Sequence, residues 1–241
     1  MSIALFSAAW EALHLLLNSF ILPSPFDVAK VIVDLTVSGE ILPHVFASLK
    51  RTMVGFFVGL LVGTAFGLFL GLNRFLRKTI TPIIEILRPI PPIAWIPLAI
   101  LWFGIGDDSA FFIIFIATFF PIFTNVFFGV QSLPLIFWRV KQNYHLNLFQ
   151  YLRHIIWPFS TPFLLAGCKI GIGFAWMAVI AAEMISANQG LGYFIEINRV
   201  LLKPERVIAA MLIIGLIGYC LQLIVVKLEK HLTAWRCTVN D

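Results

Sequence analysis

The sequence predicts an all-α polytopic membrane protein with about six transmembrane helices, and three observations lead to that fold class. Of the 241 residues, 60% are hydrophobic and only 12% are charged, whereas a soluble domain is about one quarter charged. The mean hydropathy is +0.96. The apolar residues also gather in stretches long enough to cross a bilayer, without the alternation of a transmembrane barrel. Because unpaired backbone cannot lie in lipid, each stretch is expected to be a helix.

The distribution of charge excludes other classes of protein. The formal net charge is +5, but the Lys and Arg residues punctuate apolar stretches, as they do where a membrane protein fixes its orientation. Nucleic acid is therefore not an expected partner, whereas the lipid bilayer is. The 24 Phe and 7 Trp residues argue against a disordered chain. More basic residues fall on the inner side when both termini are cytoplasmic, which favours that orientation.

One transmembrane domain is expected over residues 1–241, with a cytoplasmic coupling region at 131–161. The first span carries Glu11 and His14 and is the least regular, and no Lys or Arg precedes Lys30, which argues against a cleaved signal peptide. The second is uncharged and bracketed by Arg51 and Arg74. The six spans are expected at about residues 2–22, 53–73, 89–106, 109–130, 162–186 and 207–226.

A short amphipathic helix is expected between the first two spans. Ser24 is a good N-cap, and Pro25 occupies the first helical position, where a proline needs no amide donor. Asp27, Lys30 and Asp34 follow on this segment. The pattern predicts a helix that lies at the membrane interface.

Glycine recurs at every fourth position of the second span, at Gly55, Gly59, Gly63, Gly67 and Gly71. Positions four apart drift by only about 40° around a helix, so the glycines form a groove that another backbone can approach closely. The pattern predicts tight helix packing within one subunit. A surface that slides during conformational change is the alternative.

The stretch RPIPPIAWIPLAILWFGIG, residues 88–106, contains four prolines. Prolines remove amide donors, so we expect breaks near the start of this helix and again near Pro97. Broken backbone lies at membrane depth only where protein buries it or where it lines a watery cavity. Pro92, Trp95 and Pro97 therefore either line a transport pathway, together with Trp102, or belong to a kinked packing helix.

The fifth span holds two charges, Lys169 and Glu183. They are about 21 Å apart along a helix axis and cannot pair. Lys169 is expected to snorkel to the interface, and Glu183 faces either an aqueous pathway or a polar group of the next loop. In that loop Gly190 and Gly192 permit a sharp turn before a short amphipathic helix, which is either an outer gate or a plain surface loop. The pathway and gate candidates of this region are Trp176, Glu183, Gly190 and Gly192.

The chain shows no pattern typical of an enzyme or a metal site. Its five histidines lack ligand spacing, and Cys168, Cys220 and Cys237 form no CxxC pair. No GxxxxGK[ST] phosphate loop is present. We therefore expect no metal, no cofactor and no catalytic residue, and any ATP hydrolysis belongs to another polypeptide.

Several of these motifs together resemble a known family, the permease subunits of binding-protein-dependent ABC importers of the nitrate, sulfonate and taurine type, which have a MetI-like fold. The resemblance rests on the LPSP turn at 22–25, the glycine-rich span, the proline-rich stretch, and GIGFAWMAVIAAEMISANQGLGY at 171–193. It implies a homodimeric pathway, two cytoplasmic ABC ATPase subunits and an external substrate-binding protein in a bacterial inner membrane. The implied cargo is a small solute, including anions such as nitrate, a sulfonate or taurine.

The cytoplasmic loop departs from the family pattern. Members usually carry an EAA…G motif where a short helix docks into the ATPase, and here Arg139, Val140 and Lys141 stand at those positions with His145 at the glycine. These residues and Phe149 are the expected coupling site. The departure leaves open a divergent docking surface or weakened coupling. Interfacial anchoring is the alternative for this loop, and a gradient-driven transporter or a membrane enzyme are the alternatives for the whole chain.

Overall fold

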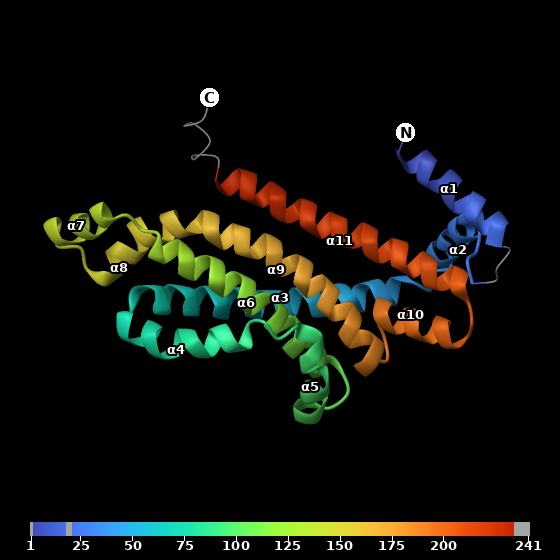
Figure 1. Cartoon of the computed structure of the whole chain (residues 1–241), viewed down its shortest axis with the longest axis horizontal. Helices are drawn as coiled ribbons and strands as arrows, with labels where there is room; N and C mark the ends of the chain where they lie inside the picture. The colour runs from blue at the N-terminus through green and yellow to red at the C-terminus, as the bar shows by residue number, and fades with distance from the viewer. Residues whose placement is uncertain (1, 18–20, 234–241) are drawn as a thin grey trace.

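The computed structural model describes residues 2–17 and 21–233, and every regular element within them is a helix (Figure 1), which confirms the all-α class. The elements in chain order are α1 (Ser2–Leu17), α2 (Pro25–Val37), α3 (Leu42–Leu72), α4 (Arg74–Leu87), the 3₁₀ helix η1 (Pro92–Trp95), α5 (Ile96–Phe103), α6 (Asp107–Gln131), α7 (Leu135–Asn143), α8 (Leu148–Tyr151), the π-helical turn η2 (Leu152–Ile156), α9 (Trp157–Ser186), α10 (Leu191–Val200) and α11 (Pro204–Leu232).

Four helices of the described chain are long and apolar enough to cross a membrane. They are α3, α6, α11 and the continuous run Leu148–Ser186 that ends in α9. A fifth span arises if α4 is counted together with η1 and α5, which meet at a bend of 91°. The expected count of six is therefore approximate. Helix α1 has 16 residues, fewer than a span requires, and residues 18–20 of the first expected span lie outside the described residues.

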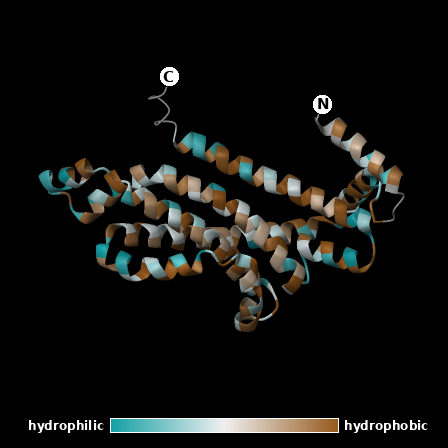
Figure 2. Ribbon diagram, in the orientation of Figure 1, coloured by the Kyte–Doolittle hydropathy of each residue, from teal (hydrophilic) through white to brown (hydrophobic). Residues whose placement is uncertain are grey.

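Helices α3, α6 and α9 form the centre of the molecule and lie side by side (Figure 1). α9 runs antiparallel to α6, since Ser186 at the end of α9 lies 3.3 Å from Ser109 at the start of α6, measured between the hydroxyl oxygens. Figure 2 shows hydrophobic residues along these helices and hydrophilic ones near the two ends, on α7 at one end and on α10 at the other. The α10 end and the α7 end are the two poles of the bundle.

The second span begins earlier than the sequence indicated. Helix α3 starts at Leu42, not near residue 53, because Arg51 is no boundary charge: its side chain is 7% exposed and ion-paired inside the helix bundle. A charge that is paired and hydrogen-bonded is compatible with a buried helix interior. The later spans also extend beyond their expected bounds, with α9 starting at Trp157 and α11 covering Pro204–Leu232.

The proline-rich stretch breaks once and not twice. Helix α4 ends at Leu87, and the backbone is extended at Pro91 before η1 and α5 follow. Pro97 does not break a helix as expected, because it lies in the first turn of α5, where its missing N–H has no intrahelical partner to lose. The expected span 89–106 is thus a bend followed by a short helix that projects from the bundle (Figure 1).

Both short helices that the sequence predicted are present. Ser24 caps α2, and its hydroxyl oxygen accepts a hydrogen bond of 3.1 Å from the Asp27 amide. Gly190 has φ +130° and precedes α10. Only glycine adopts that φ without strain, so the sharp turn before α10 depends on this residue.

Candidate functional site

A buried ion cluster joins three helices at the α10 end of the bundle. The Glu183 side chain on α9 is 0% exposed, and its Oε1 lies 2.8 Å from the Arg51 Nη1 on α3. The Arg51 Nη2 lies 2.6 Å from Oδ1 of Asp107, the first residue of α6. One arginine thus holds two carboxylates from two helices. Asp107 is also favoured at this place by the positive end of the α6 dipole.

Backbone and hydroxyl donors complete the environment of the Glu183 carboxylate. The Ser48 hydroxyl donates to Glu183 Oε2 at 2.7 Å, and the Gly192 amide donates to the same oxygen at 3.0 Å. The Leu191 amide donates to the Ser48 oxygen at 2.9 Å, and Arg51 Nη1 donates to the Gln189 carbonyl at 2.5 Å. The carboxylate is therefore satisfied by several donors, as buried polar groups generally are. These bonds tie the loop before α10 to the membrane helices.

The two loop glycines are required by this packing. A Cβ at Gly190 would overlap the Glu183 carboxylate, and a Cβ at Gly192 would overlap the Ile180 carbonyl. Of the two readings of Glu183, the polar contact to the next loop is the one that the structure shows. Ser48 and Arg51 are not among the site residues predicted from the sequence, because the predicted second span begins at residue 53. Their spacing of three residues, which puts them on one helix face, was the available signal.

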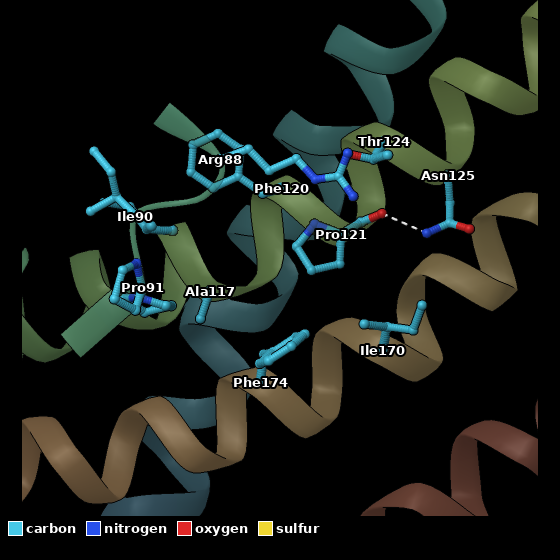
Figure 3. Close-up of a pocket in the computed structure, with 12 residues that line it drawn as sticks. Arg88, Ile90, Pro91, Ala117, Phe120, Pro121, Thr124, Asn125, Ile170 and Phe174 are labelled. Carbon is cyan, nitrogen blue, oxygen red and sulfur yellow. Dashed lines mark hydrogen bonds between the residues drawn. The ribbon is translucent and has the colours of Figure 1, made fainter. Parts of the chain in front are cut away.

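A cavity of about 360 Å³ lies between the proline bend, α6 and α9 (Figure 3). Its lining consists of Arg88, Ile90, Pro91, Pro92, Ile116, Ala117, Phe120, Pro121, Thr124, Asn125, Ile170 and Phe174. That volume falls within the range of small-molecule sites. Among the sequence-based pathway candidates, Pro92 lines this cavity.

Arg88 is the charged residue of this lining. Figure 3 shows its side chain reaching toward Pro121 and Thr124 of α6. Nearby, the Asn125 Nδ2 donates to the Pro121 carbonyl at 2.9 Å. Within residues 2–17 and 21–233, no group forms an ion pair or hydrogen bond with the Arg88 guanidinium. Arg88 is the first residue of the proline-rich stretch and is not among the site residues predicted from the sequence.

The other pathway candidates lie elsewhere. Trp95 packs edge-on against Phe112 of α6, with 6.5 Å between ring centroids. The Trp176 Nε1 donates to the Ile214 carbonyl of α11 at 3.0 Å. Pro97 is in the first turn of α5. These three residues therefore contact neighbouring helices or shape one, and do not line the cavity.

Lys169 is separated from the ion cluster. Its Nζ lies 3.9 Å from Glu229 Oε2 on α11, and both side chains are partly exposed. Glu183 is held by Arg51 at the α10 pole. A relay between Lys169 and Glu183, which a gradient-driven mechanism would need, has no contact to support it.

The five glycines of α3 face a matching row of β-branched residues on α6. A Cβ on any of them would lie within 2.6–3.3 Å of the Cβ of its partner, tighter than side chains normally approach. The partners rise in the same order and with the same spacing of four, so α3 and α6 run in the same direction. The pairs are Gly55 with Ile114, Gly59 with Thr118, Gly63 with Ile122, Gly67 with Val126, and Gly71 with Val130.

The expected coupling region forms two short helices at the pole opposite α10 (Figure 1). Helix α7 ends at Asn143, and His145 has φ +48°, the left-handed conformation that commonly ends helices and that favours glycine. Asn147 then starts α8 with a capping box, in which its side chain and that of Gln150 bond each other's backbone amides. The turn keeps a backbone shape suited to glycine although the residue is histidine.

The side chains of this region divide into two groups. Lys141 lies back against the protein, with its Nζ 5.0 Å from the centre of the Tyr151 ring, and Val140 is half-buried. Arg139 and His145 are exposed, and Phe149 is 68% exposed. The exposed set is the part of the expected coupling site that another protein can reach.

No group of His, Cys, Asp or Glu residues in the described part of the chain has the arrangement of a metal site. The Glu183 carboxylate instead accepts hydrogen bonds from Ser48, Arg51 and the Gly192 amide.

Comparisons with known proteins agree with this architecture. Residues 55–234 match the family described as binding-protein-dependent transport system inner membrane component. An ABC transporter permease protein of Methanocaldococcus jannaschii is 37% identical over 97% of this chain and 90% of its own length. The taurine transport system permease protein of Escherichia coli is 34% identical over 93% of this chain and 84% of its own. The nitrate import permease protein of Synechocystis is 36% identical over 78% of this chain and 68% of its own length.

A solved structure shares the fold. A chain from the inward-facing MetNI methionine ABC transporter superposes with a TM-score of 0.71 at 19% sequence identity, covering 80% of this chain and 96% of the other. At that identity the match establishes the arrangement of helices. The MetI-like fold expected from the sequence is therefore confirmed.

Proposed function

Because this chain belongs to the family of binding-protein-dependent transport system inner membrane components, we propose that it forms the translocation pathway of an ATP-driven importer for a small solute. It is a multi-pass membrane protein and a transport subunit without enzymatic activity of its own. ATPase and binding-protein partners follow from that role. A pairing of two copies of this chain completes the pathway in our proposal.

We assign ATPase coupling to the pole formed by α7 and α8. The observation that carries this assignment is the left-handed turn at His145, which follows α7 directly and keeps it a short, separately capped helix. The exposed side chains there are apolar and aromatic, including Tyr144 at 75% and Phe149 at 68% exposed. An exposed apolar surface rimmed by polar groups is typical of a protein contact. The loss of the acidic and small residues at 139–141 thus changes the chemistry of the docking helix and not its shape.

We assign contact with the external binding protein to the α10 pole, at the other end of the bundle. There Arg51 donates to the Gln189 carbonyl and Glu183 accepts from the Gly192 amide, so the buried cluster fixes the loop before α10. A loop that is fixed in this way presents a rigid surface. Movement of α7 toward or away from the ATPase would then be transmitted along α6 and α9, which run from one pole to the other.

A charge reversal tests the coupling assignment. Arg139→Glu places a carboxylate on the exposed face of α7, and we expect it to reduce co-purification with the ATPase and ATP-dependent uptake by about tenfold, because rim charges set association rates and complementarity. The matched control is Lys203→Glu, an exposed reversal at the α10 pole. We expect its co-purification with the ATPase to be unchanged. Unaltered co-purification and uptake for Arg139→Glu contradict the assigned docking role.

A further inference from the structure

We propose that Arg88, with Thr124 and Asn125, forms an anion site inside the permease, and that this site selects small oxyanions such as nitrate or a sulfonate during translocation. The inference rests on the proposed importer function and names the residues of this chain that would bind the solute inside the membrane. It assigns a role to the cavity between the proline bend, α6 and α9.

The first observation that supports the anion site is the charge of the cavity lining. Its lining consists of neutral side chains and one guanidinium, that of Arg88. No carboxylate among the described residues lies within ion-pair distance of this group. Ionisable side chains within membrane-spanning segments are rare and generally mark functional positions. An incoming anion would supply the missing counter-charge.

The second support is the position of the cavity along the bundle. Asn125 lies roughly 27 Å along α6 from its start at Asp107 and about 9 Å before its end at Gln131, at 1.5 Å per residue. Ile170 lies about 24 Å from the end of α9 at Ser186. Ile116 and Phe174 of the lining lie nearer the α10 ends of the same two helices, so the cavity is near the middle of the membrane-spanning region. A solute moving between the poles along these helices would pass it.

The third support is the chemistry of the donors. A guanidinium presents parallel N–H donors that match two oxygens of a planar or tetrahedral oxyanion. The Thr124 hydroxyl lies on the side of the cavity toward which Arg88 points (Figure 3). Asn125 engages one amide hydrogen with the Pro121 carbonyl and has a second available. The apolar walls, including Phe120 and Phe174, suit the carbon skeleton of a sulfonate.

Backbone geometry explains how Arg88 reaches the cavity. It is the C-cap of α4, three residues before the extended backbone at Pro91. Arg88 and the residues of the proline bend, Pro91 and Pro92, all belong to the lining of the cavity. Arg88 remains exposed on the single chain, so a solute or a reagent can reach it.

The test uses the complete importer, purified with its ATPase and binding protein and reconstituted in liposomes. ATP-dependent uptake of labelled nitrate, taurine and ethanesulfonate is measured for the unaltered complex and for Arg88→Gln and Arg88→Lys. We expect Arg88→Gln to reduce anion uptake at least about tenfold, the size of one lost charge-assisted hydrogen bond. Arg88→Lys should retain an intermediate rate, and binding-protein-stimulated ATP hydrolysis should continue.

A chemical rescue separates charge from folding, since it compares one protein with itself. Arg88→Cys is made with Cys220→Ser and Cys237→Ser, and the introduced thiol is modified with a cationic aminoethyl or an anionic sulfonatoethyl methanethiosulfonate. The cationic adduct should restore uptake and the anionic adduct should not. Excess nitrate or taurine should slow the modification. Arg77→Gln, on the same helix α4, is the matched control and should leave anion uptake as it is.

The outcomes distinguish this inference from the proposed function. Unchanged anion uptake in Arg88→Gln, or equal rescue by both reagents, overturns the anion site and leaves the importer assignment intact. ATP-dependent uptake of only neutral or cationic solutes does the same. If the unaltered complex shows no ATP-dependent uptake of any solute, the proposed function itself fails.

Discussion

The ion cluster at the α10 pole and the cavity at the proline bend each contain one arginine. The two arginines differ in burial and in their ion-pair partners. Arg51 is 7% exposed and lies between Glu183 and Asp107, at 2.8 Å and 2.6 Å. Arg88 is exposed at the edge of a neutral cavity, and no described residue forms an ion pair with it. A buried charge whose partners all belong to the protein holds the fold in place. A charge without protein partners is available to a solute.

Removing a partner of Arg51 should have the largest effect on stability. Glu183→Ala leaves the buried Arg51 guanidinium without its buried carboxylate partner, and loss of one member of a buried pair is destabilising by about 3–5 kcal/mol. Thermal unfolding in detergent measures this. Glu196→Ala removes the exposed pair with Arg199 on α10 and should have no measurable effect. Equal unfolding midpoints for the two variants would show that the cluster does not stabilise the α10 pole.

A double variant sharpens this result. Arg51→Gln combined with Glu183→Gln removes both charges, so no unpaired charge stays buried. We expect the double variant to lose clearly less stability than the sum of the two single variants, as directly contacting residues do. Simple additivity in the thermal midpoints would mean that the two side chains act independently.

An intermediate effect is expected at the α3–α6 contact, which joins the two regions because α6 carries both Asp107 and Asn125. In Gly59→Ala the new Cβ would lie 2.7 Å from the Cβ of Thr118. Overpacking of this kind is destabilising by about 1–3 kcal/mol. Gly173→Ala on α9 is the matched control, since no atom outside its own helix lies within 4 Å. Its unfolding midpoint should stay the same or rise.

If Gly59→Ala is as stable as Gly173→Ala, α3 and α6 are not in the close contact that the structure shows. The alternative reading of the glycine row as a sliding surface would then gain support. The comparison of the two alanine variants in SDS denaturation or thermal unfolding decides between them.

The smallest effect is expected at the α7 pole, away from both arginines. His145 has φ +48°, and non-glycine residues are strained there by about 1–2 kcal/mol, part of which the greater freedom of glycine in the unfolded chain offsets. His145→Gly should therefore raise stability by about 0.5–1 kcal/mol. Gln142→Gly, inside α7, should lower it by up to about 1 kcal/mol. A thermal midpoint that falls in His145→Gly contradicts the strained turn.

The sequence predicted the features that depend on local composition. The apolar stretches predicted α3, α6, α9 and α11, and Ser24 with Pro25 predicted the start of α2. Both signals are local, because they depend on the residues of one stretch and on the capping residues beside it. The left-handed turn at His145 coincided with a position where the resembled family carries glycine. These features can be predicted without knowing which elements each helix contacts.

The sequence did not predict the features that depend on distant partners. Arg51 looked like a boundary charge, because its carboxylate partners lie on α6 and α9, more than fifty residues away. Trp176 looked like a pathway residue, yet its donor is used by the Ile214 carbonyl of α11. Arg88 stood out only once the cavity showed that its neighbours are neutral. Pairing of a charge is a property of the fold and not of the stretch that carries it.

The most direct test of this contrast compares Arg51→Gln with Arg88→Gln in the same reconstituted complex. Each is measured for its thermal unfolding midpoint and for ATP-dependent uptake of nitrate, taurine or ethanesulfonate. The contrast predicts that Arg51→Gln lowers the unfolding midpoint, whereas Arg88→Gln keeps the midpoint and loses at least about tenfold in anion uptake. An Arg88→Gln complex that unfolds as early as Arg51→Gln, or that takes up anions at the unaltered rate, contradicts it.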